Sequence, residues 1–176
     1  MTSYAQRHVT RGGTLRAFVL AASLPISIPA TRPSLKLASD VDACTLLTTA
    51  EASKALEVTS LPGKRLIASS PKICVWSNDS TQGFGGRRVN LSVMTPAAFQ
   101  VGKSAGARGI NIEPVSGLGD EAYYEIPKTD SPFLFVRKGQ TAFSVRILNS
   151  LKMKAFSREQ EKAKEADLAK AAVARL

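Results

Sequence analysis

The chain has 176 residues, of which 44% are hydrophobic and 22% are charged. This length is enough for a single domain with a sizeable core, and the composition excludes wholesale disorder. The formal net charge is +10, an excess that can attract acidic polymers or anionic lipid. The basic residues occur as scattered pairs, with no block interleaved with aromatic residues. We therefore expect a basic surface and no dedicated nucleic-acid site.

The N-terminal segment resembles an export signal. Arg7, Arg11 and Arg16 form a positively charged region, Leu15, residues 17–22 and Leu24 form a short apolar core, and small residues follow up to Ala30. The run is short and prolines interrupt it, which argues against a membrane span. We therefore expect residues 1–30 to be a signal peptide, residues 31–39 an extended lead-in, and residues 40–176 one domain. The alternative is a disordered N-terminal extension.

The chain contains two cysteines, Cys44 and Cys74. In an exported protein two cysteines usually pair, so we expect a disulfide between them. A closed loop of about 30 residues stabilises the fold by about 3.5 kcal/mol in the chain-entropy model. Two separate buried thiols remain the alternative for a cytosolic chain. No cysteine precedes Cys44, so lipid tethering is not supported, and no other stretch is apolar enough to cross a bilayer.

The first half of the expected domain contains one helix followed by strands. Thr48 and Glu51 have the spacing of a capping box, which predicts a helix that runs to about Leu56. A turn follows at residues 61–63. Alternating apolar and polar residues then predict strands. These strands cover residues 64–68, 72–76 and 88–93.

The second half begins with a short helix, for which Thr95 is the cap and Pro96 the first helical residue. Strands are expected over residues 110–113, 122–126, 133–137 and 141–148, the last two as a hairpin. Ser157 and Gln160 form a second capping box, which predicts a C-terminal helix. Its buried stripe is expected to consist of Ala166, Ala169, Val173 and Leu176.

These elements predict an α+β fold. An antiparallel sheet of about five to seven strands is expected, with the early helix and the C-terminal helix packed on one face. Cys74 and Trp76 share one face of their strand, so we expect Trp76 to pack in the core against the disulfide. The alternative is that Trp76 serves as a stacking platform for a ligand.

The aromatic pair Tyr123–Tyr124 supplies the other candidate ligand contact. Neighbours on a strand point to opposite faces, so one tyrosine is expected in the core and the other exposed. An exposed Tyr124 beside a groove is the better candidate. Trp76 and Tyr124 are therefore the two residues that we single out for ligand contact.

The chain offers little for catalysis. Its single histidine, His8, lies in the expected signal peptide, which leaves no Ser-His-Asp triad, no Cys-His pair and no histidine-ligated zinc. Asp120 and Glu121 are the only adjacent carboxylates. We expect their side chains to diverge, with Asp120 as a turn cap and Glu121 as a solvated charge. No catalytic residue, metal ligand or cofactor is expected.

Several segments, taken in order, also resemble a known family. They are residues 44–48, 51–52, 74–77, 117–123, 136–139 and 168–176. Together they are similar to a small bacterial, extracytoplasmic, lipoprotein-like domain family of unknown function, best known from actinobacteria. The resemblance implies a secreted or membrane-tethered envelope domain with one disulfide, and it implies no established activity. The lipoprotein members carry an N-terminal lipidated cysteine that this chain lacks.

We therefore expect a secreted or periplasmic, non-catalytic binding or interaction domain. Its partner would be an envelope protein, an anionic envelope polymer or a small ligand. One alternative is a histidine-free hydrolase of cell-envelope material, which requires a deep pocket holding a carboxylate with a raised pKa. The other alternative is a basic nucleic-acid-binding protein. It requires four cations on one face: Arg87, Arg88, Arg137 and Lys138.

Overall fold

The computed structural model describes residues 40–79, 86–104, 106, 109–149 and 155–176; the expected signal peptide and lead-in lie outside this part. The helical elements are η1 (Ala43–Thr45), a 3-10 turn, and the α-helices α1 (Thr49–Leu56), α2 (Pro96–Lys103) and α3 (Arg158–Val173). The strands are β1 (Lys64–Ile67), β2 (Ser70–Ser77), β3 (Arg88–Met94), β4 (Asn111–Val115), β5 (Glu121–Ile126), β6 (Phe133–Lys138) and β7 (Thr141–Leu148). Among these described helices, none is both long and apolar enough to cross a bilayer.

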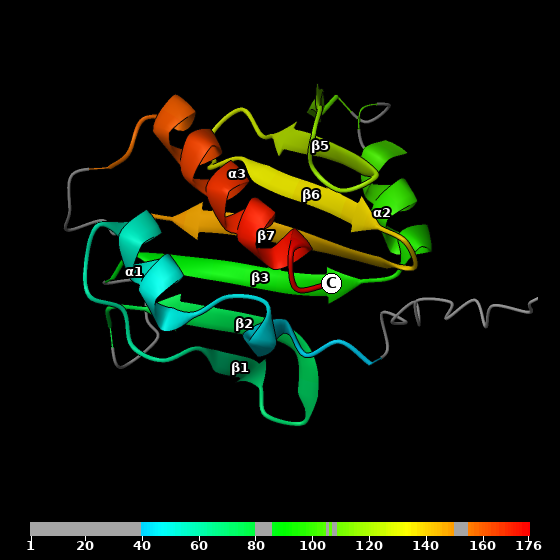
Figure 1. Ribbon diagram of the computed structural model, residues 1–176. Coiled ribbons are helices and arrows are strands. Elements are labelled where there is room, and N and C mark those ends of the chain that lie inside the picture. The colour runs from blue at the N-terminus through cyan, green and yellow to red at the C-terminus, as the bar shows by residue number, and fades with distance from the viewer. Residues whose placement is uncertain (1–39, 80–85, 105, 107–108, 150–154) are drawn as a thin grey trace, which may run out of the picture. The chain divides into compact units, whose positions relative to one another are not determined.

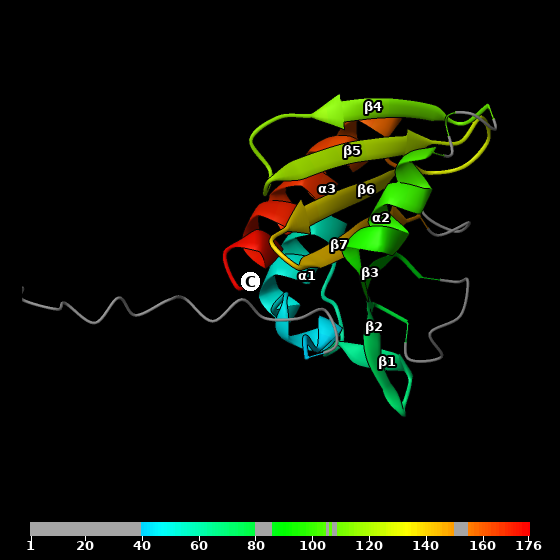
Figure 2. The same cartoon turned by 90° about the vertical axis from the view of Figure 1, so that its right-hand side faces the viewer.

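The seven strands form one antiparallel sheet in the order β1-β2-β3-β7-β6-β5-β4. Helices α1 and α3 lie on one face of this sheet, and α2 lies on the other (Figures 1 and 2). The α+β prediction is confirmed, including the number of strands and the shared face of the early and C-terminal helices. The sequence did not predict that α2 covers the opposite face.

The main core lies between the sheet and the α1–α3 layer. Strand register places Cys74, Leu91, Val145 and Leu134 in one row across four strands. Each of these four side chains is fully buried. Successive strand residues point to opposite faces of the sheet. This row therefore identifies the alternate residues of β2, β3, β7 and β6 that face α1 and α3.

The disulfide joins η1 to the second strand. Cys44 and Cys74 are bonded with their Cα atoms 5.0 Å apart, which confirms the predicted pair. Trp76 lies on the same face of β2 and is 1% exposed, so it packs in the core, as expected, and is no exposed stacking platform. The chain passes close by at Gly63, where a Cβ would lie 2.6 Å from the Trp76 ring. This segment therefore tolerates only glycine at that point.

Helix α3 rests on the sheet with a different stripe from the one predicted. Of the four expected residues only Ala169 is fully buried, and Ala166, Val173 and Leu176 are half-buried. The buried residues are Glu161, Glu165, Leu168, Ala169 and Ala172. The prediction was wrong because it assigned every glutamate of the helix to the solvent side.

Candidate functional site

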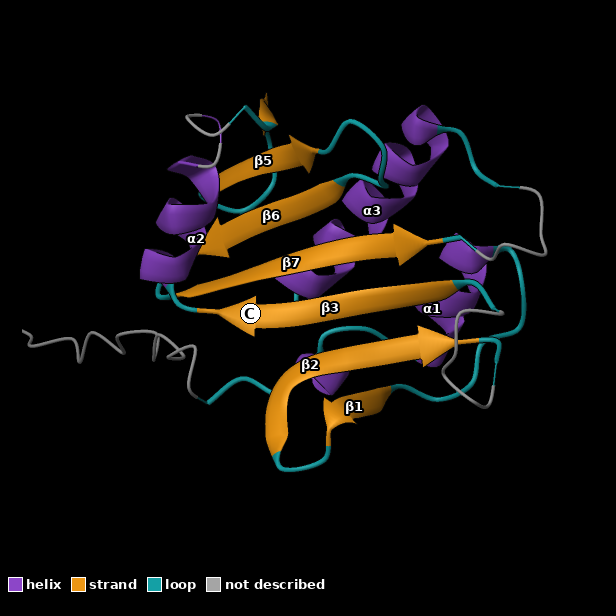
Figure 3. Cartoon of the chain, turned by 180° about the vertical axis from the view of Figure 1, so that it is seen from behind, coloured by secondary structure: helices purple, strands orange, loops and turns teal. Residues whose placement is uncertain are grey.

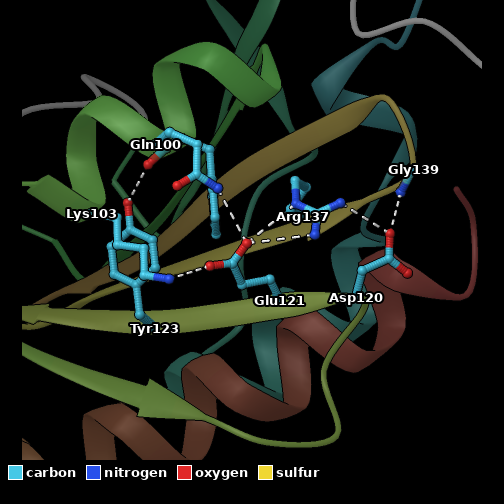
Figure 4. Close-up of polar contacts among 8 residues, drawn as sticks. Gln100, Lys103, Asp120, Glu121, Tyr123, Arg137 and Gly139 are labelled. Carbon is cyan, nitrogen blue, oxygen red and sulfur yellow. Dashed lines mark hydrogen bonds and ion pairs between the residues drawn. The ribbon is translucent and has the colours of Figure 1, made fainter.

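The richest group of polar contacts lies on the face of the sheet that carries α2. Glu121 of β5 and Arg137 of β6 are direct cross-strand neighbours. The last turn of α2 brings Gln100 and Lys103 to the same place, and Asp120 precedes the strand (Figure 4). We call these five residues the Glu121 cluster.

Glu121 is the centre of this cluster. Its Oε1 accepts a hydrogen bond from Lys103 Nζ at 2.5 Å, and its Oε2 accepts from Gln100 Nε2 at 3.2 Å. The Nε of Arg137 lies 3.4 Å from the same Oε2. The hydrogen bond from Lys103 lowers the pKa of the Glu121 carboxyl. Glu121 is therefore ionised at neutral pH, which suits an ion pair better than a general acid.

Asp120, in the turn before β5, also contacts the guanidinium of Arg137. Its Oδ2 lies 3.3 Å from Arg137 Nη1 and accepts a hydrogen bond from the backbone N–H of Gly139 at 2.7 Å. The expectation that the Asp120 and Glu121 side chains diverge was wrong, because Asp120 stands before the strand and is not bound by its alternation. Asp120 does cap a turn, as expected, namely the β6–β7 turn, whereas Glu121 is ion-paired and not simply solvated.

The turn before β5 has a backbone that requires glycine. Gly119 has φ +59°, and a Cβ there would lie 2.4 Å from the Arg137 carbonyl oxygen. The N–H of Asp120 donates to that same oxygen at 2.8 Å. This close approach holds the β4–β5 turn against β6 and so places both carboxylates at Arg137.

A small second core lies beneath α2. Its centre is Tyr123, which is 1% exposed and donates a hydrogen bond from its hydroxyl to the Phe99 carbonyl at 2.8 Å. The Tyr123 ring stacks on Phe135 with their centroids 5.0 Å apart. Burial raises the pKa of the Tyr123 hydroxyl. The tyrosine is therefore a neutral packing residue that fixes α2 on the sheet.

Gly102 lets α2 approach this core, which leads to a prediction. A Cβ at Gly102 would lie 2.5 Å from the Tyr123 hydroxyl oxygen. We expect Gly102→Ala to lower the free energy of unfolding by about 1–2 kcal/mol, although alanine normally stabilises a helix interior by about 1 kcal/mol over glycine. Urea unfolding measures the change. In a Tyr123→Phe background the obstructing oxygen is absent, so there Gly102→Ala should be neutral or stabilising. An equal loss in both backgrounds would show that the hydroxyl is not the obstacle.

Two of the cavities that open on the described surface are of comparable size. One, of about 450 Å³, lies under the β4–β5 turn beside the Glu121 cluster. Its apolar lining includes Ile112, Pro114, Val115, Leu118, Ala122 and Tyr123, and Lys103 and Glu121 supply charge. We call it the β4–β5 cavity. The other, of about 390 Å³, lies between α1 and α3 and is lined by Glu51, Lys54, Ala55, Lys164, Asp167, Leu168 and Ala171.

Comparison with known proteins finds no family model that matches this chain. No curated protein and no solved structure matches it either. The Cys44–Cys74 disulfide is compatible with a location outside the reducing cytosol.

The position of Tyr124 corrects the expected ligand contact. Its side chain lies beneath α3 and is only 5% exposed, so the expected exposure was wrong. The hydroxyl donates a hydrogen bond to the Lys162 carbonyl at 2.6 Å. Both tyrosines are buried because the sheet is covered on both faces at β5. The tyrosine that borders a cavity is Tyr123.

Sequence reasoning missed a pair of buried carboxylates on α3. Glu165 is completely buried; its Oε1 accepts a hydrogen bond from the Ile147 N–H at 2.9 Å, while Oε2 has no hydrogen-bond partner among the described residues. Burial raises the pKa of Glu165 to about 9. Glu161 is 5% exposed, and burial raises its pKa as well. Glu161 and Glu165 are four residues apart and share a helix face with Leu168, Ala169 and Ala172. This spacing was the sequence signal that could have predicted their burial.

Neither Glu161 nor Glu165 is among the residues that line the β4–β5 cavity or the α1–α3 cavity. The four cations of the nucleic-acid alternative are also divided between faces. Arg87 donates to the Leu56 carbonyl, and Lys138 donates to the Val173 carbonyl, so both lie on the α1–α3 side. Arg137 lies on the α2 side in the Glu121 cluster. The single basic face that this alternative needs is not formed.

Proposed function

We propose that this chain is a secreted or periplasmic, non-catalytic domain that binds a component of the cell envelope. The observation that carries the proposal is the disulfide between Cys44 and Cys74, whose second sulfur is fully buried in the core. Such a bond forms and persists where the surroundings are oxidising. The bond joins the start of the domain to β2.

The β4–β5 cavity is the proposed binding site. Its lining is mostly apolar, with Lys103 and Glu121 at one side, which is the usual composition of a site that buries an apolar group and orients it with few polar contacts. A volume of about 450 Å³ accommodates an apolar side chain of an envelope protein or a small ligand. The partner class that we favour is an envelope protein.

A binding role fits the electrostatics of this site better than catalysis does. The carboxyl of Glu121 has its pKa lowered by Lys103, so it is held as an anion in an ion pair. The carboxyl with the strongly raised pKa, Glu165, lines neither cavity. No specific contact favours the hydrolase alternative.

The proposal includes the relationship to the small lipoprotein-like envelope family. The similar segments contain both cysteines of the disulfide and residues 117–123, the turn before β5 and the start of that strand, which line the β4–β5 cavity. The shared segments thus coincide with the covalent bond and with the proposed site.

The location is tested by fractionating native cells and labelling thiols in each fraction after denaturation. The protein should be found in the extracytoplasmic fraction, with neither Cys44 nor Cys74 reacting before reduction. Protein in the cytosolic fraction with two reactive thiols would overturn the proposal.

The site is tested by photo-crosslinking in the same cells. A photoreactive residue at Ser116, on the exposed rim of the β4–β5 cavity, should give a discrete crosslinked product. The matched control places it at Lys170, which is exposed on α3 away from that cavity. Equal products from the two positions, or none from Ser116, would contradict the assignment of the site.

A further inference from the structure

The end of the β1–β2 hairpin exposes apolar side chains. All four residues of β1 are exposed, and Leu66 and Ile67 are each 54% exposed. Leu61, which precedes the strand, is 39% exposed. We call residues 64–69 the hairpin tip. Leu66 and Ile67 thus expose two large aliphatic side chains at consecutive positions, and exposed apolar patches are characteristic of interaction surfaces.

The tip stays uncovered because the hairpin bends away from the rest of the sheet. The pairing register between β1 and β2 shifts between Arg65 and Ile67, and Pro71, which lies opposite this shift, has no N–H to donate to the ladder. Irregular pairing of this kind increases twist and bends the strands. The start of β2 curves sharply, and the tip projects away from the helices (Figures 1 and 3).

The same segment is basic. From Val58 to Asn78 the sequence contains Lys64, Arg65 and Lys72 and no aspartate or glutamate. Arg65 is bonded to Asp42, yet 46% of its side chain remains exposed. The exposed apolar residues are thus flanked by positive charge on the protruding end of one hairpin.

We propose that the hairpin tip docks the protein on an anionic lipid surface. Leu66 and Ile67 enter the boundary between headgroups and acyl chains, and Lys64 and Arg65 bind the anionic headgroups. Apolar insertion combined with basic flanks is the physical requirement for such peripheral binding. A second copy of the chain fits this edge less well. Pairing of the β1 edges of two copies would form a ladder of only four residues. It would also place the positive charges of Lys64 and Arg65 of both copies close together.

Docking through the tip also sets the orientation of the domain. β1 and β4 are the two outermost strands of the sheet order. A tip held at the membrane therefore leaves the β4–β5 cavity at the far end of the sheet. Lipid docking and ligand binding use separate surfaces, so this inference does not rest on the proposed function.

A tryptophan placed in the tip tests the inference with the full chain. We expect Leu66→Trp to show a blue-shifted emission on adding vesicles of phosphatidylglycerol and phosphatidylcholine, and quenching when the lipids are brominated. The wild-type chain, whose Trp76 is 1% exposed, supplies the baseline. The matched control is Val101→Trp on α2, a position that is 63% exposed and should show neither change. Because the probe sits in the tip, membrane contact made elsewhere in the chain does not produce the shift.

The contribution of the basic residues to lipid binding is tested in the Leu66→Trp background. Adding Lys64→Gln should weaken partition into the anionic vesicles about fivefold, and vesicles of phosphatidylcholine alone should bind much less. High salt should weaken the binding further. Three results would overturn the proposal: no spectral change for Leu66→Trp, an equal change for Val101→Trp, or a concentration-dependent dimer in which residue 66 is protected without lipid.

Discussion

Replacing both cysteines, in Cys44→Ala/Cys74→Ala, should lower the free energy of unfolding by about 3.5 kcal/mol. The bond closes a loop with a sequence separation of 30 residues, so its removal restores conformational freedom to the unfolded chain. Domains are typically stable by only about 5–15 kcal/mol, which makes this a large fraction of the total. Urea unfolding followed through the emission of Trp76, the single tryptophan, measures the effect.

Reductant provides the control for this experiment. Added to the wild-type chain it should reproduce the loss seen in the double variant, and added to the double variant it should change nothing. A loss below about 1 kcal/mol would mean that the unfolded chain is already compact between Cys44 and Cys74. It would also contradict the view that the disulfide holds η1 on β2.

The second large effect concerns Glu165. Glu165→Gln should raise the free energy of unfolding at pH 7 by about 1–3 kcal/mol. Burial raises the pKa of this carboxyl from 4.5 to about 9, so the folded protein keeps it protonated where the unfolded chain ionises it. The stability contributed by the protonated group is complete below pH 4.5 and is lost as the pH rises toward 9. Glutamine resembles the protonated form and does not titrate.

Unfolding at pH 5, 7 and 8.5 separates this mechanism from a packing effect. The advantage of Glu165→Gln should be small at pH 5 and should grow with pH. Glu159→Gln, on the exposed side of the same helix, is the matched control and should show no such growth. A variant that is less stable by the same amount at every pH would show that the packing of this side chain, not charge burial, decides the outcome.

Carboxylates in ion pairs, such as Asp42 and Asp130, affect stability in the opposite direction on acidification. Arg65 lowers the pKa of Asp42, and Arg146 lowers that of Asp130, each through a hydrogen bond to the carboxylate. Their contributions are present above the unfolded pKa and are lost as the pH falls through the lower folded value. Asp42 and Asp130 remain in Glu165→Gln, so acidification should still lower the stability of this variant.

The elements of this fold follow from short-range patterns in the sequence. The capping boxes at Thr48 and Ser157 begin α1 and α3 as predicted, because each cap satisfies N–H groups within its own first turn. The alternation over β3 places Val89, Leu91 and Val93 on the buried face. The pairing of Cys44 with Cys74 follows from there being only two cysteines in a chain with an export-like N-terminus.

The candidate site was less predictable. Alternation correctly separates the faces of Tyr123 and Tyr124, but it does not say that α2 covers one face and α3 the other, so that both side chains are buried. The convergence of Asp120 and Glu121 on Arg137 depends on a backbone contact at Gly119 between two hairpins. Local patterns predict β5 and β6, but they do not predict the close backbone approach between Gly119 and Arg137.

By itself, the sequence determined the helices, the strands, the disulfide and the positive charge, since each depends on residue type, spacing or number. Only the tertiary structure decided which helix covers which face, where Glu161 and Glu165 are buried, and that the β4–β5 cavity and the hairpin tip lie at opposite ends of the sheet. The physical reason is that the burial of a side chain depends on how two elements pack against each other. A residue is enclosed only when a distant part of the chain packs over it.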